Sequence, residues 1–385
     1  MTIACKFARA CLIGYHGMQN LGDDLFCQVL CEWIDDVFEP RTIEVDGIES
    51  RLPPLITRAR VKGVRPETSL GPVGRRMHEW RLLLRNELVV FGGGSLFQRR
   101  DFFWLWFTLW TSRVWHRIRG KKQRVAAVGV SVGPFHRKSH KTWFVRAARW
   151  MDAILLRDHS DASQGLNLNH AMHGFDLALA YDCEQLLTSR VPSQGKEFVV
   201  ALTLVDRDSQ HGHAEIDDRK KQALVACLKL LNERFGHLKV QVFVFCGDLE
   251  RGDNEVSRQF ASRLAAEEID AEVVPYANDP QKTLVQFAMC DLAICNRMHS
   301  HVLANMLGRP NVALAYEEKM LHFANMLELP AGTVLGLKDI DSDKLMAAIE
   351  SALRKQDWQA AAERVAGCGE RVKQDLAHLA STLKR

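Results

Sequence analysis

The stretch Ile294-Cys-Asn-Arg-Met-His-Ser-His-Val-Leu-Ala-Asn-Met-Leu-Gly-Arg-Pro310 indicates how the chain folds. An apolar strand is predicted over residues 292–295. It ends in a polar corner, and a helix with one apolar face follows until the closing Gly-Arg-Pro. A second apolar strand, residues 311–315, comes next. This order predicts a parallel sheet, in which ligands bind at the carboxyl ends of strands, beside helix N-termini.

The polar corner after the first strand holds candidate site residues. Arg297 supplies a fixed cation, His299 a group that can titrate near neutral pH, and Asn296 an amide. Lys319 follows the second strand and adds a further cation. Together these residues can bind an anion and transfer a proton. The alternatives are a His299 that only caps the helix and a Lys319 that lies solvated at the surface.

Composition limits the class of protein. The chain has 385 residues, 47% of them hydrophobic, which is enough for two domains. Its net charge of +4 is too small to indicate nucleic acid binding. The ten cysteines form no Cys-x-x-Cys pair, and no histidine cluster has metal-ligand spacing, so we expect reduced core cysteines and no metal. Neither a signal peptide nor a membrane-spanning helix is predicted, which indicates a cytoplasmic protein.

Strands and helices alternate along both halves of the sequence. This pattern predicts an α/β protein with two doubly wound, Rossmann-like domains that face a cleft. Residues 1–187 are predicted to form the N-terminal domain and residues 188–196, which are polar and rich in turn formers, a linker. The C-terminal domain then covers residues 197–342, and residues 343–385 form further helices.

Two glycine-rich segments of the first half follow predicted strands. The loop from Gly14 to Asp24 contains Gly17 and Asn20, and glycine there allows a ligand to approach the backbone closely. The second segment follows a strand predicted over residues 87–91 and consists of Gly92, Gly93, Gly94 and Ser95. Its backbone N–H groups can form a nest that binds an anion or sugar hydroxyls. Close packing of two segments is the alternative explanation for the glycines.

A cation and an aromatic segment complete the candidates. Arg157 ends the strand predicted over residues 153–156, either as part of a site or in a structural pair with Asp158. The segment Phe102–Trp115 carries four of the nine tryptophans and is followed by basic residues. It is predicted to be either a buried helix or an interfacial helix that touches anionic lipid at the inner face of the membrane.

Several of these motifs together resemble the polysaccharide pyruvyl transferase family. The resemblance rests on the loop 14–24, the triple glycine, and Val128-Gly-Val-Ser-Val-Gly-Pro134. It also rests on Leu156-Arg-Asp-His-Ser160, Asp176-Leu-Ala, and Arg297-Met-His299 with the following Gly308-Arg-Pro310, Tyr316 and Lys319. The sequence departs from the family pattern at Asp24, where glutamate is usual, and at Ser131, where glycine is usual.

The resemblance implies a fold similar to two-domain GT-B glycosyltransferases and the transfer of pyruvyl from phosphoenolpyruvate to hydroxyls of a glycan or lipid-linked glycan precursor. Phosphoenolpyruvate is then a co-substrate, and no cofactor is expected. Arg157, Arg297, Lys319 and Asn296 would bind the donor, with His299 as general acid and Asp24 as proton acceptor. Gly17, Asn20 and residues 92–95 would line the acceptor side.

Two other functions remain open from the sequence. A GT-B glycosyltransferase that uses a nucleotide sugar would share this architecture. A noncatalytic glycan- or lipid-binding protein would use the aromatic segment and would tolerate the loss of both Arg297 and His299.

Overall fold

The computed structural model divides into two compact units, each with its own parallel sheet. The first unit is Met1–Met18, Gly22–Tyr181 and Cys368–Arg385, and the second is Gln19–Leu21 and Asp182–Gly367. The predicted linker, residues 188–196, lies outside the described residues. The residues described are 7–67, 71–98, 101–133, 135, 137–157, 166, 168, 170–183, 197–206, 214–248, 252–316, 318–330, 332–354 and 358–385.

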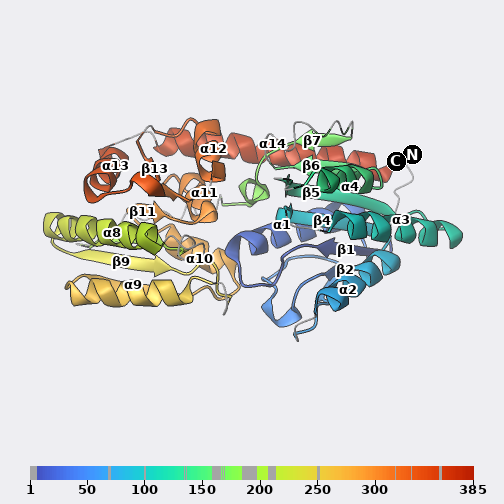
Figure 1. Cartoon of the computed structure of the whole chain (residues 1–385), viewed down its shortest axis with the longest axis horizontal. Helices are drawn as coiled ribbons and strands as arrows, with labels where there is room; N and C mark the ends of the chain where they lie inside the picture. The colour runs from blue at the N-terminus through green and yellow to red at the C-terminus, as the bar shows by residue number, and fades with distance from the viewer. Residues whose placement is uncertain are drawn as a thin grey trace. The chain divides into compact units, whose positions relative to one another are not determined.

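The first unit is organised around a parallel sheet with the order β3-β2-β1-β4-β5-β6-β7 (Figure 1). β1 is an interior strand of this sheet, with β2 pairing along one of its edges and β4 along the other. The strands are β1 (Arg9–Ile13), β2 (Thr42–Val45), β3 (Arg60–Gly63), β4 (Leu88–Phe97), β5 (Arg124–Val132), β6 (Ala153–Leu156) and β7 (Ala171–His173).

Helices cover both faces of this sheet. On one face, apolar side chains of α2 (Pro72–Arg85), α3 (Phe102–Ile118) and α4 (Lys138–Ala148) join those of the strands in one core. α1 (Leu21–Phe38) packs on the other face, where Gly92 of β4 lies directly beneath Leu30. The short helices η1 (Glu49–Arg51) and η2 (Leu177–Ala180) lie in connections.

The second unit repeats the plan with a sheet in the order β10-β9-β8-β11-β12-β13. Its strands are β8 (Phe198–Thr203), β9 (Leu238–Phe243), β10 (Asp270–Val274), β11 (Leu292–Cys295), β12 (Asn311–Ala315) and β13 (Val334–Gly336). Its helices are α8 (Ala214–Phe235), α9 (Asn254–Ala266), α10 (Pro280–Phe287), α11 (Met298–Met306), α12 (Glu318–Met326), η3 (Leu337–Asp339) and α13 (Ser342–Arg354). All strand pairs are parallel, so the strand ends that follow β8 and β11 share one edge.

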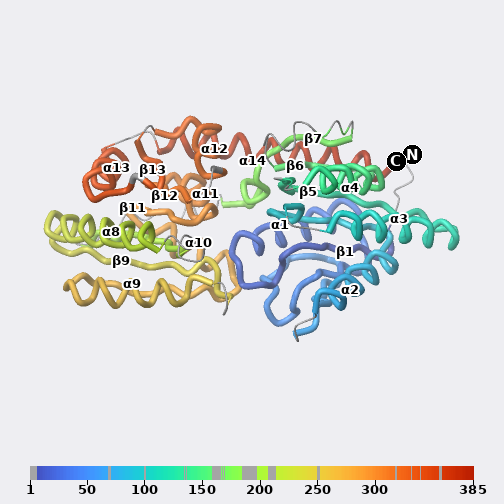
Figure 2. Tube along the Cα trace, in the orientation of Figure 1, coloured from blue at the N-terminus to red at the C-terminus, as the bar shows by residue number. Residues whose placement is uncertain are grey.

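The last helix, α14 (Trp358–Lys384), belongs to both units. Its first part joins the core of the second unit, where the Trp358 indole N–H donates to the Ala352 carbonyl (2.8 Å). Its last part, from Cys368, belongs to the first unit, where the Trp33 indole N–H donates to the Leu376 carbonyl (3.2 Å). Figure 2 follows this helix, in red, to the C-terminus.

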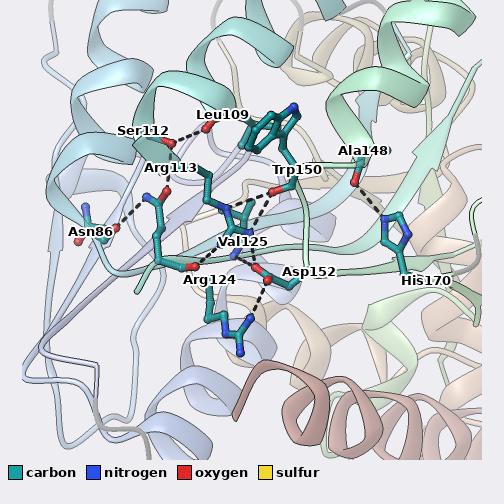
Figure 3. Close-up of polar contacts among 11 residues, drawn as sticks. Asn86, Leu109, Ser112, Arg113, Arg124, Val125, Ala148, Trp150, Asp152 and His170 are labelled. Carbon is teal, nitrogen blue, oxygen red and sulfur yellow. Dashed lines mark hydrogen bonds and ion pairs between the residues drawn. The ribbon is translucent and has the colours of Figure 1, made fainter. Parts of the chain in front are cut away.

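A polar network fixes the amino-terminal edge of the first sheet (Figure 3). The Asp152 carboxylate, just before β6, accepts from Arg113 of α3, from Arg124 (2.8 Å) and from the Val125 backbone N–H (2.8 Å) of β5. Nearby, the Ser112 hydroxyl donates to Gln123 (3.0 Å). These contacts tie α3 to β5 and β6 at the edge opposite to the carboxyl ends.

The prediction of two α/β domains with parallel sheets is confirmed. Three strands, β3, β7 and β13, were not expected, because each is short and only partly buried and so has a weak apolar pattern. β4 also continues to Phe97 rather than ending at Phe91. The triple glycine therefore lies inside a strand, next to a register shift between Gly94 and Phe97.

Candidate active-site residues

Arg157 is the centre of a polar cluster at the carboxyl ends of β4, β5 and β6. Its Nε donates to the Ser131 hydroxyl (2.7 Å), its Nη1 to Asp176 (3.2 Å) and its Nη2 to the Ser95 hydroxyl (3.4 Å). The Arg157 side chain is only 8% exposed, so these contacts hold it in a fixed orientation. Asp158, the alternative partner, lies outside the described residues.

The glycines of β4 have a clear packing role. A Cβ on Gly92 would lie 2.3 Å from the Leu30 side chain, and one on Gly93 would lie 2.5 Å from the Phe26 ring. Gly93 and Gly94 also have φ values of 77° and 69°, which disfavour other residues. A Cβ on Gly94 would lie 3.2 Å from an Asp23 carboxylate oxygen. The structure thus explains Gly92 and Gly93 by close packing, and it places the exposed Ser95 beside Arg157.

The loop after β1 is held by its own polar groups. The Gly17 N–H donates to Asp24 (3.3 Å), and the Asp24 side chain is fully buried. Asn20 belongs to the second unit, where it forms an isolated antiparallel bridge with Cys246. Asp24 is therefore placed to shape the loop, whereas its neighbour Asp23 is half-buried and lies near Gly94.

Arg297 precedes the first turn of α11, and its guanidinium is paired with Asp253, which precedes α9. Arg297 Nε donates to Asp253 Oδ2 (3.0 Å) and Nη2 donates to Oδ1. Asp253 is 1% exposed and also accepts from the Cys246 N–H (3.0 Å). Burial acts to lower the pKa of Arg297, but the charge and hydrogen bonds of Asp253 outweigh it and raise that pKa. The guanidinium is therefore charged and fixed in orientation.

Asp253 is not among the site residues predicted from the sequence. Its only local signal is its position directly before a predicted helix, where aspartate is common as a capping residue. The side chain makes no cap hydrogen bond to α9. It turns instead to a residue 44 positions later in the chain.

The two histidines of α11 differ in their surroundings. His299 lies in the first turn and is half-buried. His301 is fully buried, its Nδ1 lies 3.0 Å from Asn311 Oδ1, and burial lowers its pKa to about 4. His301 thus has the structural role, and His299 remains the histidine near Arg297 at the helix start.

Asn296 is fully buried and serves the framework of the second unit. Its amide donates to the Leu314 carbonyl (3.0 Å), and its Oδ1 accepts from the Val205 N–H (3.0 Å) and from Lys220 Nζ (3.1 Å). These bonds link the ends of β8, β11 and β12. Asn296 therefore positions the Arg297 corner, and the structure does not present it as a direct ligand of a donor.

A hydroxyl relay fixes the same corner. The Asn296 backbone N–H donates to the Thr203 hydroxyl (3.0 Å), which lies 2.8 Å from the Ser300 hydroxyl. Ser300 in turn donates to the Arg297 carbonyl (2.7 Å). Lys319, half-buried, occupies the first turn of α12 after the neighbouring strand. The polar residues of this unit thus gather at the carboxyl edge of its sheet.

Among the described residues, no group of three or more histidine, cysteine or acidic side chains could hold a metal ion. Cys27, Cys31, Cys290 and Cys295 are free and buried. Within the same residues, no helix is long and apolar enough to cross a membrane.

The family model for polysaccharide pyruvyl transferase matches residues 20–318. The chain belongs to the polysaccharide pyruvyl transferase family. Both the Arg157 cluster and the Arg297–Asp253 pair lie within the matched part of the chain. No match was found among curated proteins.

Similarity to solved structures identifies the fold of this member of the polysaccharide pyruvyl transferase family. The putative UDP-N-acetylglucosamine 2-epimerase from Listeria monocytogenes superposes with a TM-score of 0.61 at 10% identity, covering 97% of this chain and 96% of the other. Anabaena Alr3699/HepE in complex with UDP-glucose gives a TM-score of 0.55 at 16% identity, covering 97% and 100%. At these identities the similarity shows the fold alone, a two-domain α/β architecture of the GT-B type.

Proposed function

We propose that the protein transfers pyruvyl from phosphoenolpyruvate to hydroxyls of a glycan or lipid-linked glycan precursor and forms a pyruvate ketal in surface polysaccharide biosynthesis. Membership of the family supports a pyruvyl transferase in general. The observation that carries the finer proposal is the corner after β11, where a charged, fixed Arg297 lies two residues from His299. Phosphoenolpyruvate is a small anion, so its chemistry requires a cation that binds it and a group that donates a proton.

Cations would bind the donor. The carboxylate and phosphate groups of phosphoenolpyruvate both match the planar guanidinium. Asp253 uses the Nε–Nη2 edge of Arg297, so an anion would meet the Nη1–Nη2 edge. Lys319, of the same unit as Arg297, is proposed to hold the second anionic group, and Arg157, of the first unit, is a further proposed donor-binding cation. Asn296 contributes by positioning Arg297. The chemistry proposed here uses no metal and no cofactor.

The proposed reaction begins when His299 gives its proton to the methylene carbon, which becomes a methyl group. One glycan hydroxyl then adds to C2 and releases its proton. The bond from C2 to the phosphate oxygen breaks, phosphate leaves with the electron pair, and a second hydroxyl closes the ketal. The two hydroxyl protons restore His299 and protonate the departing phosphate. Asp24 was the expected acceptor of a hydroxyl proton, but its burial favours the half-buried Asp23 beside Gly94.

On the acceptor side, we propose that Gly17, Gly94 and Ser95 border the bound sugar, with Gly92 and Gly93 allowing the close approach of α1 that shapes this edge. Asn20 is a further proposed acceptor-side residue. A lipid-linked acceptor would bring the protein to the inner face of the membrane, with the Phe102–Trp115 segment as the contact.

The test is release of inorganic phosphate from phosphoenolpyruvate in the presence of lipid-linked or free glycans. His299→Ala is expected to reduce turnover by about a hundredfold or more, as loss of a general acid does. The control is His322→Ala, which replaces an exposed histidine of α12 and is expected to retain turnover. Wild-type turnover in the His299→Ala variant, with its fold intact, would contradict the assignment.

The second candidate is a glycosyltransferase that uses a nucleotide sugar. It is favoured by the solved structure of Anabaena Alr3699/HepE with UDP-glucose, whose fold this chain shares. Incubation of the same protein preparation with UDP-glucose or UDP-N-acetylglucosamine distinguishes the two candidate functions. Release of UDP without any release of phosphate from phosphoenolpyruvate would favour this candidate.

A further inference from the structure

α3 exposes a continuous aromatic surface. We call it the aromatic ridge: Phe103, Trp106 and Trp110 of α3 with Trp143 of α4. The ring centroids of Phe103 and Trp143 are 4.8 Å apart, those of Trp106 and Trp143 are 5.3 Å apart, and Trp106 stacks on Trp110 at 6.1 Å. Phe103 is 48% exposed and Trp110 39%. The ridge is therefore a connected surface and not a set of isolated apolar residues.

The outward face of α3 continues the ridge with aliphatic side chains. Val114 is 39% exposed and Ile118 75%. The spacing from Phe103 through Trp110 and Val114 to Ile118 keeps them on one side of the helix. The opposite side, with Phe102, Leu105 and Leu109, is buried in the core. The expectation of a buried helix therefore holds for the inward face of α3, and the outward face is exposed.

The helices that carry and flank this apolar face are rich in cations. α3 lies beside α2 and α4 (Figure 2), and the sequences of the three helices contain nine lysines and arginines and one acid, Glu79. Their net charge is therefore +8, against +4 for the whole chain. The Arg146 guanidinium lies 4.6 Å from the Trp143 ring, at the edge of the ridge. Three adjoining acids are paired with cations: Asp101 with Arg76 (2.7 Å), Asp152 with Arg113 of α3, and Glu87 with Lys121 (2.6 Å).

We propose that the ridge and the cations of α2, α3 and α4 form a docking surface for an anionic lipid membrane. Tryptophan and phenylalanine suit the boundary between headgroups and acyl chains, and lysine and arginine attract anionic headgroups. A second copy of the chain is disfavoured, because the two positive faces would repel each other. Nucleic acid would bind the cations and stack on the rings, but it offers Val114 and Ile118 no counterpart.

The experiment measures flotation of the full-length protein with vesicles of phosphatidylcholine, with and without phosphatidylglycerol. Binding is expected only with phosphatidylglycerol and should weaken as salt is added. Trp110→Ser with Ile118→Ser is expected to weaken binding by at least roughly tenfold. The matched control is Leu230→Ser with Val285→Ser, which removes two exposed apolar side chains of α8 and α10 and is expected to leave binding unchanged.

The charge contribution has its own pair of variants. Arg117→Glu with Lys141→Glu changes two exposed cations of α3 and α4 and is expected to weaken vesicle binding by roughly tenfold. Arg258→Glu with Lys282→Glu makes the same charge change on α9 and α10 and is expected to have no such effect.

Three outcomes would overturn the proposal. One is an absence of binding to anionic vesicles. Another is equal binding by the wild type and both variants of the docking surface. The third is concentration-dependent self-association, or DNA binding at the same salt, that is lost in these variants while vesicle binding is absent. Since vesicle binding is measured without turnover, it can fail or succeed independently of the pyruvyl transfer assay.

Discussion

At the scale of single residues, Asp253 determines which part of Arg297 a ligand can reach. Asp253→Asn keeps the shape of the side chain but replaces one accepting oxygen with an amide NH2 group that faces a guanidinium donor. Arg297 would lose its fixed orientation, so we expect the KM for phosphoenolpyruvate to rise by roughly tenfold with a smaller change in kcat. Steady-state kinetics of phosphate release measures both constants.

The control for this prediction is Asp279→Asn. Asp279 caps α10 of the same unit by accepting from the Lys282 N–H (3.2 Å), so its loss has a purely structural effect. An unchanged KM in the Asp253 variant, or an equal rise in both variants, would show that the ion pair does not position Arg297 for the donor.

Asp46 gives a prediction about acid stability. It is bound by Arg65 (2.8 Å) and lies 3.4 Å from His78. Burial acts to raise the pKa of Asp46, but the nearby His78 and the guanidinium of Arg65 outweigh it and lower that pKa to about 2. Because the folded-state pKa is lower than the unfolded-state value of about 4, the ionised group stabilises the fold above that pH. This contribution is lost as pH falls from about 4 to about 2.

Urea unfolding of the wild type and of Asp46→Asn tests this. At pH 7 we expect the variant to be less stable by about 2 kcal/mol, and near pH 3 the difference should shrink. Asp36→Asn, at a carboxylate that is 75% exposed, should show no comparable pH-dependent difference. A difference for Asp46 that stays constant with pH would refute the linkage.

Single residues also show where prediction from sequence ended. The sequence predicted that Arg157 and Arg297 each follow a buried strand. This was possible because an apolar run that ends in polar residues can be recognised within a short segment. The partners of these arginines were not predicted, since they lie 26 positions away at Ser131 and 44 positions away at Asp253. Ser131 stood out only as a departure from the family pattern. Such contacts depend on the register of the sheets, which short segments do not reveal.

At the scale of elements, the β4–α1 contact depends on the absence of a side chain. Gly93→Ala would place a methyl group against the Phe26 ring at a residue with φ of 77°. We expect a loss of about 2–4 kcal/mol in the free energy of unfolding, from backbone strain and overpacking together. Gly120→Ala separates the two effects, because Gly120 has φ of 64° and open space at the Cβ position.

The Gly120→Ala control should therefore lose only about 1 kcal/mol in the free energy of unfolding, from backbone strain alone. Urea unfolding of both variants and of the wild type measures the two losses. Equal losses in the two variants would mean that packing against α1 does not explain the glycine. The sequence identified this triple glycine as important and left two explanations open. The close approach of α1 in the structure favours packing at Gly92 and Gly93 and leaves Gly94 and Ser95 at the edge of the proposed acceptor site.

At the scale of the whole molecule, α14 contributes buried residues to two units that have separate cores. Its buried residues after Cys368 include Val372, Leu376, Leu379 and Leu383, which belong to the first unit. Leu379→Ala is expected to destabilise that unit by about 3 kcal/mol, since it empties a fully buried leucine site. Ala377→Ser, at an exposed position of the same helix, is the control.

Hydrogen exchange of the full-length protein locates the effect of Leu379→Ala. Amides of β1 and β2 should exchange faster than in the wild type, because local opening of the first unit becomes easier. Amides of β9 and β11 should keep their wild-type protection, because the second unit retains Trp358 and Ala361 of the same helix in its own core. Equally faster exchange in both sheets would instead mean that α14 makes the two units unfold together. The two compact units would then not be separate cooperative folding units.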